Sequence, residues 1–156
     1  MNKEKSSMKS SIFEQLTPHF NLYEFVASKT AYRKKISNIP SEEVVENIRA
    51  LCVNVLEHLS RACGHPVYIS SGYRCPELNK AVGGVPNSQH IKGEAADIKG
   101  ESKFINWVFG NYIKKNLPFD QLIFEKCDDN GYPSWIHVSY RRNEKLNRKQ
   151  IIYTKL

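Results

Sequence analysis

The segment SQHIKGEAAD places His90 seven residues before Asp97. Two histidines and a carboxylate can hold a catalytic zinc ion and leave its fourth position open for water. His90 and Asp97 would be the near pair of ligands, and His137 would be the distant third. Gly93 permits a sharp turn between the pair, and the small Ala95 leaves space beside Asp97. From spacing alone, ordinary structural histidines are the alternative to a metal site.

The same segment fits the pattern Ser-x-His-x-x-Gly-x-Ala-x-Asp at every fixed position. It resembles the signature of the zinc D,D-peptidases of bacterial cell walls. That group includes D-alanyl-D-alanine carboxypeptidases, vancomycin-resistance dipeptidases and phage L-alanyl-D-glutamate endolysins, with the hedgehog signalling domain as a structural relative. Four other stretches resemble the group in chain order: HFNLYEF, ISSGYRCPELNKAVGG, FDQLIFE and WIHVSY. The resemblance covers residues 17–140 and implies a zinc metallopeptidase.

The resemblance also implies roles for individual residues. His90, Asp97 and His137 correspond to the three zinc ligands. Arg74, in SGYR, corresponds to an arginine that holds the substrate or the developing oxyanion, and a structural arginine is the alternative. The other candidate substrate-binding residues are Ser88, Gln89, Trp135 and Ser139. For Ser88, a purely local role in the turn is the alternative.

One position departs from the pattern of the group. Many members carry a catalytic acid three residues before the last histidine, where this chain has Ser134, and a serine cannot act as the general base. We predict that Glu125 replaces the acid, because strand pairing should place it beside His137. Asp128 and Asp129 rank behind it as candidates.

The pairing of two strands, FDQLIFE and SWIHVSY, carries this prediction. If Glu125 lies opposite His137, one face of the hairpin is almost wholly apolar, and the other face collects Gln121, Ile123, Glu125, Trp135, His137 and Ser139. A slip of one residue would mix the two classes, so burial should exclude it. A two-residue turn at Asn130 and Gly131 would produce that slip, and we therefore expect a loop of three residues or more.

The remaining elements predict a single α+β domain. Residues 41–64 predict a long helix that begins at an N-cap, Ser41, and ends at Gly64. A capping box, Asn21 with Glu24, predicts a short helix. Further strands are predicted at 66–70, 94–100 and 150–155, and a further helix at 102–116. The expected fold is a small, mostly antiparallel sheet that carries the zinc site and is flanked by helices.

The domain boundaries follow from composition and charge. We expect residues 1–11 to be a disordered segment and residues 12–156 to be the peptidase domain. The net charge of +7 lies in the two ends, since residues 1–9 carry +2 and residues 141–156 carry +5. We interpret 141–156 as a solvated basic segment, and docking on a polyanion is the alternative.

The composition also bounds the location of the protein. No run reaches the roughly 20 apolar residues of a membrane span. The N-terminus lacks the apolar core of a secretory signal. We therefore expect a cytoplasmic, monomeric protein that reaches the cell wall after holin-type release and does not bind nucleic acid.

The leading functional prediction is a zinc-dependent hydrolase of peptide bonds in peptidoglycan stem peptides. It would act as a D,D-carboxypeptidase or as an L-alanyl-D-glutamate endopeptidase of the phage or prophage endolysin type. The alternative is a catalytically weak or inactive zinc-containing module that binds the cell wall, and the serine at position 134 favours it. A nucleic-acid binder is a third class, but the chain has no motif typical of one.

Overall fold

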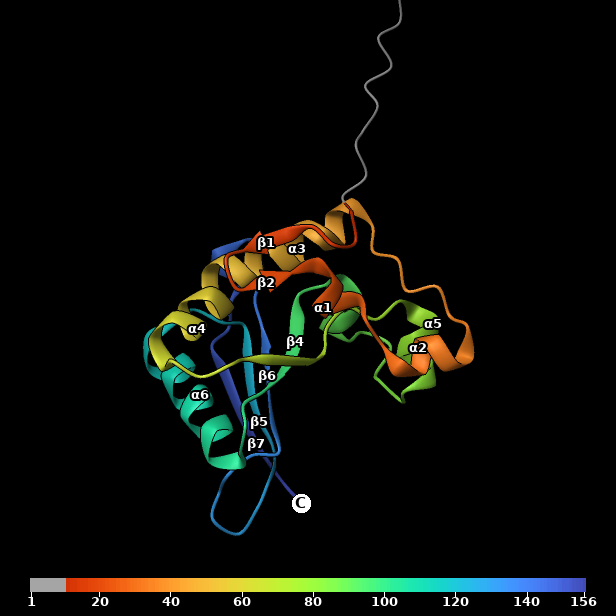
Figure 1. The fold of residues 1–156 in the computed structure, drawn as a ribbon. Helices are drawn as coiled ribbons and strands as arrows, with labels where there is room; N and C mark the ends of the chain where they lie inside the picture. The colour runs from red at the N-terminus through yellow and green to blue at the C-terminus, as the bar shows by residue number, and fades with distance from the viewer. Residues whose placement is uncertain (1–10) are drawn as a thin grey trace, which may run out of the picture.

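A computed structural model describes residues 11–156, so the N-terminal segment predicted to be disordered lies almost wholly outside the described residues. Its centre is a five-stranded sheet in the order β3-β4-β6-β5-β7 (Figure 1). The strands are β3 (Tyr68–Ser71), β4 (Ala95–Lys99), β5 (Gln121–Cys127), β6 (Trp135–Ser139) and β7 (Gln150–Lys155). All neighbours pair antiparallel except β5 and β7, which are parallel. The predicted α+β fold with a mostly antiparallel sheet is confirmed.

The long helix predicted at 41–64 forms as α3 (Glu42–Leu51), a π-helical turn η1 (Cys52–Leu56) and α4 (Glu57–Cys63). The hydroxyl oxygen of Ser41 accepts a hydrogen bond from the Val44 N–H, and Gly64 ends the helix in the left-handed region at φ +63°. Both capping predictions are confirmed. The buried residues of this helix pack into the main core, which includes Val45, Ile48, Leu51, Val55 and Leu59.

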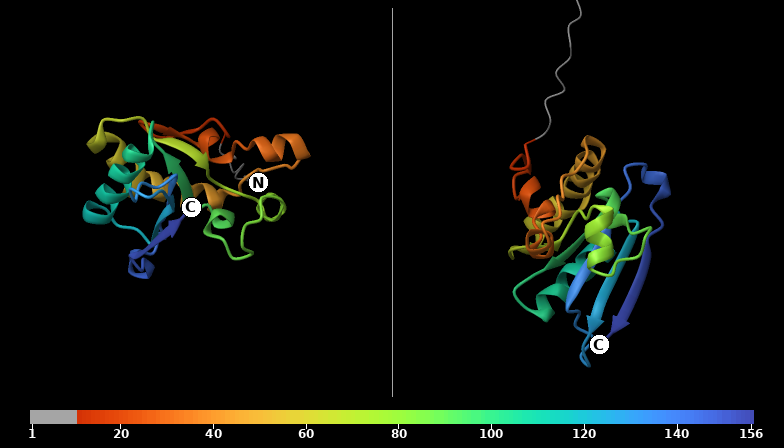
Figure 2. Two further views of the ribbon diagram at one scale, coloured as in Figure 1. Left: turned by 90° about the horizontal axis from the view of Figure 1, so that it is seen from below. Right: turned by 90° about the vertical axis from the view of Figure 1, so that its right-hand side faces the viewer.

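Helix α6 (Lys103–Asn116) packs against the same face of the sheet. The contact is close at Gly110, where a Cβ atom would lie 2.3 Å from a ring carbon of Phe124 and 2.8 Å from Ile136. The α3–α4 helix and α6 therefore cover one face of the sheet. The short helix α5 (Pro76–Ala81) and its following loop lie over the other face (Figure 2).

The β5–β6 hairpin has the predicted faces but not the predicted register. Leu122, Phe124, Ile136 and Val138 are fully buried, as expected for the apolar face. However, Ile123 lies opposite His137, and Glu125 lies opposite Trp135, which is a shift of two residues from the predicted pairing. A shift of two residues leaves every side chain on its face, so burial does not oppose it. The connecting loop covers residues 128–134, and the two-residue turn is absent there, as predicted.

Several short elements complete the described residues. The capping box at Asn21 and Glu24 forms as predicted and begins α1 (Leu22–Val26). The sequence did not predict the small hairpin of β1 (Gln15–Thr17) and β2 (Phe20–Asn21) or the helix α2 (Lys29–Lys34). Two 3-10 turns, η2 (Gln89–Lys92) and η3 (Glu144–Leu146), were also unpredicted. Among residues 11–156, no helix has both the length and the apolar character needed to cross a membrane.

Candidate metal centre

The turn η2 positions His90 before strand β4. The hydroxyl oxygen of Ser88 accepts a hydrogen bond from the His90 N–H at 3.2 Å, and Gly93 ends the turn at φ +72°. Gly93 is also required sterically, because a Cβ atom there would lie 2.7 Å from the Val44 carbonyl oxygen. The sequence prediction of a sharp turn at this glycine is therefore confirmed, and the close approach to α3 is a second reason for it.

The imidazole of His90 is held in one orientation. Its Nδ1 lies 2.7 Å from the carbonyl oxygen of Gly72, which follows β3. A carbonyl oxygen only accepts hydrogen bonds, so Nδ1 must carry the proton and donate it. The lone pair of His90 is then on Nε2. An imidazole whose second nitrogen donates to a backbone carbonyl is the usual arrangement of a metal-binding histidine.

The pairing of β4 with β6 brings the other two side chains to this nitrogen. Asp97 lies directly opposite His137 in the register. Asp97 Oδ1 is 3.0 Å from His137 Nδ1 and 3.3 Å from His90 Nε2. The sequence prediction that these three residues converge is thus reproduced by the fold, although forty residues separate Asp97 from His137 along the chain.

This donor set fits a metal ion. Ligand atoms placed tetrahedrally at about 2.0–2.1 Å from zinc lie about 3.3 Å from one another. The two separations from Asp97 Oδ1 are of that size, and all three candidate ligand atoms lie within 4.8 Å of one another. Two imidazole nitrogens and one carboxylate oxygen leave room for a fourth ligand. His90, Asp97 and His137 could therefore hold a metal ion.

Electrostatics keep the Asp97 carboxyl ionised. Burial alone would raise its pKa, but the hydrogen bond from His137 and the adjacent imidazole of His90 outweigh burial, and the pKa lies below its ordinary value. A carboxylate must be deprotonated to bind a cation. The side chain is therefore already in its metal-binding charge state at neutral pH.

A cavity of about 730 Å³ opens over these residues. Arg74 lines it, and the Arg74 N–H donates to the His90 carbonyl oxygen at 3.1 Å. Partial burial lowers the pKa of the guanidinium, and the negative charge of Asp97 opposes that effect. The Arg74 Nε atom is buried and has no hydrogen-bond partner among the described residues. Arg74 therefore retains a donor near the three candidate ligands.

Glu125 and Trp135 line the same cavity, but Ser134 does not. Glu125 Oε2 accepts a hydrogen bond from the Thr154 hydroxyl at 2.9 Å. The Ser134 hydroxyl donates to the Lys126 carbonyl oxygen at 2.9 Å, so it is engaged by the loop backbone. Glu125 is thus on the metal-site face, as predicted, although it is a diagonal neighbour of His137 and not its direct partner.

The other predicted substrate-binding residues have different positions. Gln89 lines the cavity, and its Nε2 atom is buried without a partner among the described residues. Ser88 also lines the cavity while its hydroxyl caps η2. Ser139, predicted to bind substrate, is instead fully buried and does not line the cavity. Its hydroxyl oxygen accepts a hydrogen bond from the Gln121 N–H at 3.0 Å, which holds the start of β5 in place.

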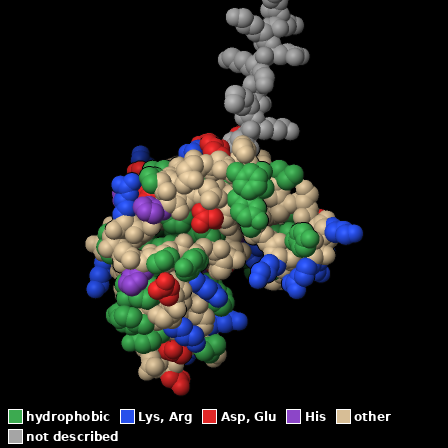
Figure 3. Space-filling view, viewed as in Figure 1, with side chains coloured by type: hydrophobic (Ala, Val, Ile, Leu, Met, Phe, Trp, Pro, Cys, Tyr) green, Lys and Arg blue, Asp and Glu red, His purple; other side chains and the backbone are tan. Residues whose placement is uncertain are grey.

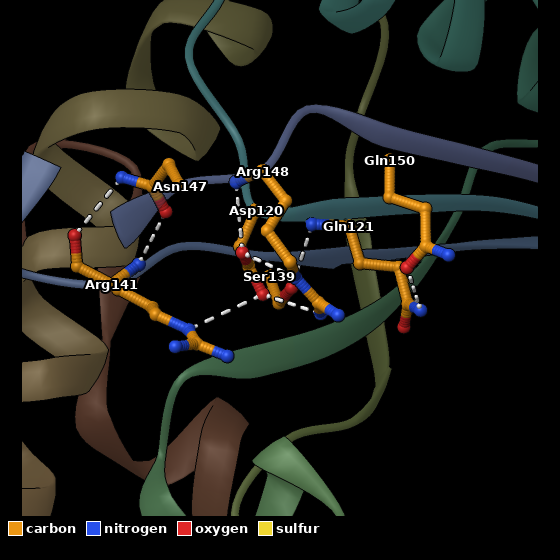
Figure 4. A network of polar contacts seen from close by, with 7 residues as sticks. All are labelled: Asp120, Gln121, Ser139, Arg141, Asn147, Arg148 and Gln150. Carbon is orange, nitrogen blue, oxygen red and sulfur yellow. Dashed lines mark hydrogen bonds and ion pairs between the residues drawn. The ribbon is translucent and has the colours of Figure 1, made fainter. Parts of the chain in front are cut away.

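Sequence reasoning missed one polar network at the edge of the cavity (Figure 4). Asp120 is completely buried, and Arg148 binds its carboxylate through Nε at 3.0 Å and Nη2 at 2.9 Å. Arg141 Nε lies 3.4 Å from the same carboxylate. Arg141 and Arg148 both line the cavity. Their basic character was visible in the sequence, but nothing there linked them to an aspartate more than twenty residues earlier.

Comparison with known proteins supports a family assignment. A family model described as Peptidase M15 matches residues 18–139, which contain all three candidate metal ligands. No curated protein matches the chain.

Proposed function

The chain belongs to the peptidase M15 family, and from this we propose that it is a zinc-dependent peptidase that hydrolyses peptidoglycan stem peptides. The observation that carries the proposal is the convergence of His90, Asp97 and His137 in the lining of a cavity. A bound zinc ion supplies a water of lowered pKa and polarises the carbonyl to be cleaved. The family implies the reaction class, and the resemblance of the motifs to cell-wall peptidases supports the substrate.

In this proposal Glu125 is the general base. It accepts a proton from the attacking water and delivers it to the amine that leaves. The hydrogen bond from Thr154 fixes one carboxylate oxygen and leaves the other available for this transfer. Its position on the metal-site face compensates for the absence of an acid at position 134.

Arg74 stabilises the oxyanion that develops on the cleaved carbonyl. Its fixed backbone contact to His90 and its buried, unpartnered Nε support this role. Gln89 and Trp135 border the cavity and contact the substrate, whereas Ser88 positions His90. This geometry fits a carboxypeptidase, and it also fits an endopeptidase of the endolysin type. We further propose that the protein acts on the cell wall as a monomer.

The test is the release of new amino groups from purified peptidoglycan by the zinc-loaded protein. We expect release that stops on chelation and returns with zinc. Glu125→Gln should retain zinc and lose about a hundredfold or more in rate, because it cannot accept the proton. Glu101→Gln, at an exposed carboxylate outside the cavity, is the matched control. Unchanged turnover by Glu125→Gln would remove that residue from the role, and mass analysis of the fragments identifies the bond.

A second candidate function is a zinc-containing module that binds the cell wall without cleaving it. The observation that favours it is Ser134, which replaces the usual acid and donates its hydroxyl hydrogen to the backbone. The module would retain zinc and bind sedimented peptidoglycan, yet release no amino groups in the same assay. Binding with no release decides for this function, and release decides for the peptidase.

A further inference from the structure

The cavity extends beyond the metal centre to two arginines that share one buried aspartate. The Arg148 guanidinium donates a bidentate pair of hydrogen bonds to the Asp120 carboxylate. The Arg148 backbone N–H also donates to Asp120 Oδ1, at 3.0 Å. Arg141 approaches the other oxygen, Oδ2, and Figure 4 shows the two guanidinium groups reaching the carboxylate from two sides. Two positive charges thus face one negative charge. The excess positive charge is held in place at the cavity wall.

The backbone of Arg141 is also fixed. The Asn147 side chain accepts from the Arg141 N–H at 2.9 Å and donates to its carbonyl oxygen at 3.1 Å. The side chains of both arginines remain partly exposed, 34% for Arg141 and 50% for Arg148. A guanidinium has five N–H donors, and Asp120 engages only some of them. The donors that remain are available to a ligand in the cavity.

The position of this pair relative to the metal centre is set by the sheet. Arg141 follows His137 by four residues and lies two residues beyond the end of β6, and four residues span about 13 Å in an extended chain. Glu125 lies on the other side of His137, since it pairs with Trp135 at the start of β6. An extended peptide covers about 3.3–3.6 Å per residue. A peptide bound across His137 would therefore reach the arginines within about four residues.

The charges that line the cavity favour an anionic ligand. Asp97 and Glu125 are its acidic residues, whereas its basic residues are Arg74, Lys92, Arg141 and Arg148. Asp97 is committed to the candidate metal ion, whose own charge would increase the positive excess. Arginine forms paired, charge-assisted hydrogen bonds with carboxylates, and these are among the stronger polar contacts.

We propose that Arg141 and Arg148 form a subsite that binds a carboxylate of the substrate peptide within about four residues of the cleaved bond. The inference rests on the proposed function and specifies its substrate class as an acidic peptide. A carboxylate fits better than a long polyanion, because the two arginines face into the cavity of the metal centre. Lys145 of the same basic segment is exposed and lies outside that cavity.

The test compares two synthetic stem peptides that differ only in having free carboxylates or carboxamides. Binding is measured by calorimetry on zinc-loaded Glu125→Gln protein, in which hydrolysis is slow, and kcat/KM is measured on the zinc-loaded unsubstituted protein. We expect the free acid to bind about tenfold more tightly than the amide. Arg141→Gln should bring this ratio close to one. Lys145→Gln, which removes the same charge outside the cavity, should leave it unchanged.

Three results would overturn the subsite. The first is equal affinity for acid and amide in the protein with both arginines, which needs no substitution of either arginine. The second is an equal loss of preference in Lys145→Gln and Arg141→Gln, which would indicate a long-range effect of charge. The third concerns inorganic polyphosphate as a competitor of the peptide. If Arg141→Gln and Lys145→Gln weaken this competition equally, the arginines belong to a surface that binds polyanions. Acid-selective binding without cleavage would instead refute the peptidase and retain the subsite.

Discussion

At the scale of single residues, the candidate metal centre depends on orientation as much as on ligand identity. The Gly72 carbonyl oxygen fixes the protonated nitrogen of His90, and the pairing of β4 with β6 sets Asp97 opposite His137. Both imidazoles are therefore already in position before an ion binds. Preorganised ligands lose less conformational freedom on binding, and this favours tight binding of the ion.

The charge of Asp97 should therefore dominate the affinity for zinc. Asp97→Asn keeps the size of the side chain but removes the negative charge between the two histidines. We expect zinc affinity to fall by about a hundredfold or more, since the loss of an outer hydrogen-bond partner alone costs about 10–100-fold. Competition with a chelating dye measures it. Asp129→Asn, in the exposed loop, should bind zinc as the unsubstituted chain does, and full affinity in Asp97→Asn would exclude that residue as a ligand.

Sequence could predict the candidate ligands but not the groups that support them. His90 and Asp97 lie in one short motif whose spacing has chemical meaning, and His137 occurs in a recognisable strand. The groups that orient the site are of another kind. Gly72 contributes a backbone carbonyl, and Thr154 reaches Glu125 from a strand at the far end of the chain. Such contacts leave no local pattern, because they depend on which strands are neighbours in the sheet.

At the scale of elements, the β5–β6 hairpin shows which part of a register is encoded locally. Alternation of apolar and polar residues fixed the two faces correctly, because a slip of one residue would expose the buried set. It could not distinguish pairings that differ by two residues. The register is completed by β4 and β7, which pair with the outer sides of this hairpin, and by the loop at 128–134.

A single carboxylate joins the small N-terminal hairpin to helix α4. Glu57 is buried and accepts hydrogen bonds from the backbone N–H and the ring of His19, at 2.8 and 2.6 Å. Arg61, one turn later, donates to it at 3.2 Å. Burial would raise the pKa of Glu57, but the hydrogen bonds from His19 outweigh burial and lower it from 4.5 to about 2.

Glu57→Gln should reduce the free energy of unfolding by roughly 2 kcal/mol at pH 7. Because the folded state lowers the pKa, the stabilisation is complete above pH 4.5 and is lost as the pH falls towards about 2. Protonated Glu57 resembles glutamine, so the difference between the two proteins should shrink over this range. Urea titrations at pH 7, 4 and 2.5 measure it. Glu101→Gln should show no such trend, and a difference that grows on acidification would contradict the assignment.

At the scale of the whole molecule, total charge concealed where the charges act. The sequence predicted a solvated basic segment at 141–156, yet β7 joins the sheet, and Arg148 is tied to a buried aspartate. The formal charges of residues 10–140 sum to zero. Lys and Arg side chains nevertheless gather over α2, which contains Lys29, Arg33 and Lys34 (Figure 3). Composition gives the sum of charges, whereas the fold decides which of them converge on a site.

The candidate metal centre also links parts of the fold that lie far apart in sequence, so metal binding should stabilise the entire molecule. Its candidate ligands come from η2, β4 and β6, and the His90 ring is hydrogen-bonded to the residue that follows β3. If an ion binds only the folded state and its free concentration is a hundred times its Kd, it raises the free energy of unfolding by about 2.7 kcal/mol. For a chain of this size, that corresponds to a rise in Tm of about 5–10 °C. Scanning calorimetry with zinc and with a chelator measures the shift. Asp97→Asn should show little of it, and identical Tm values for the unsubstituted protein under both conditions would mean that the three side chains do not form a metal site.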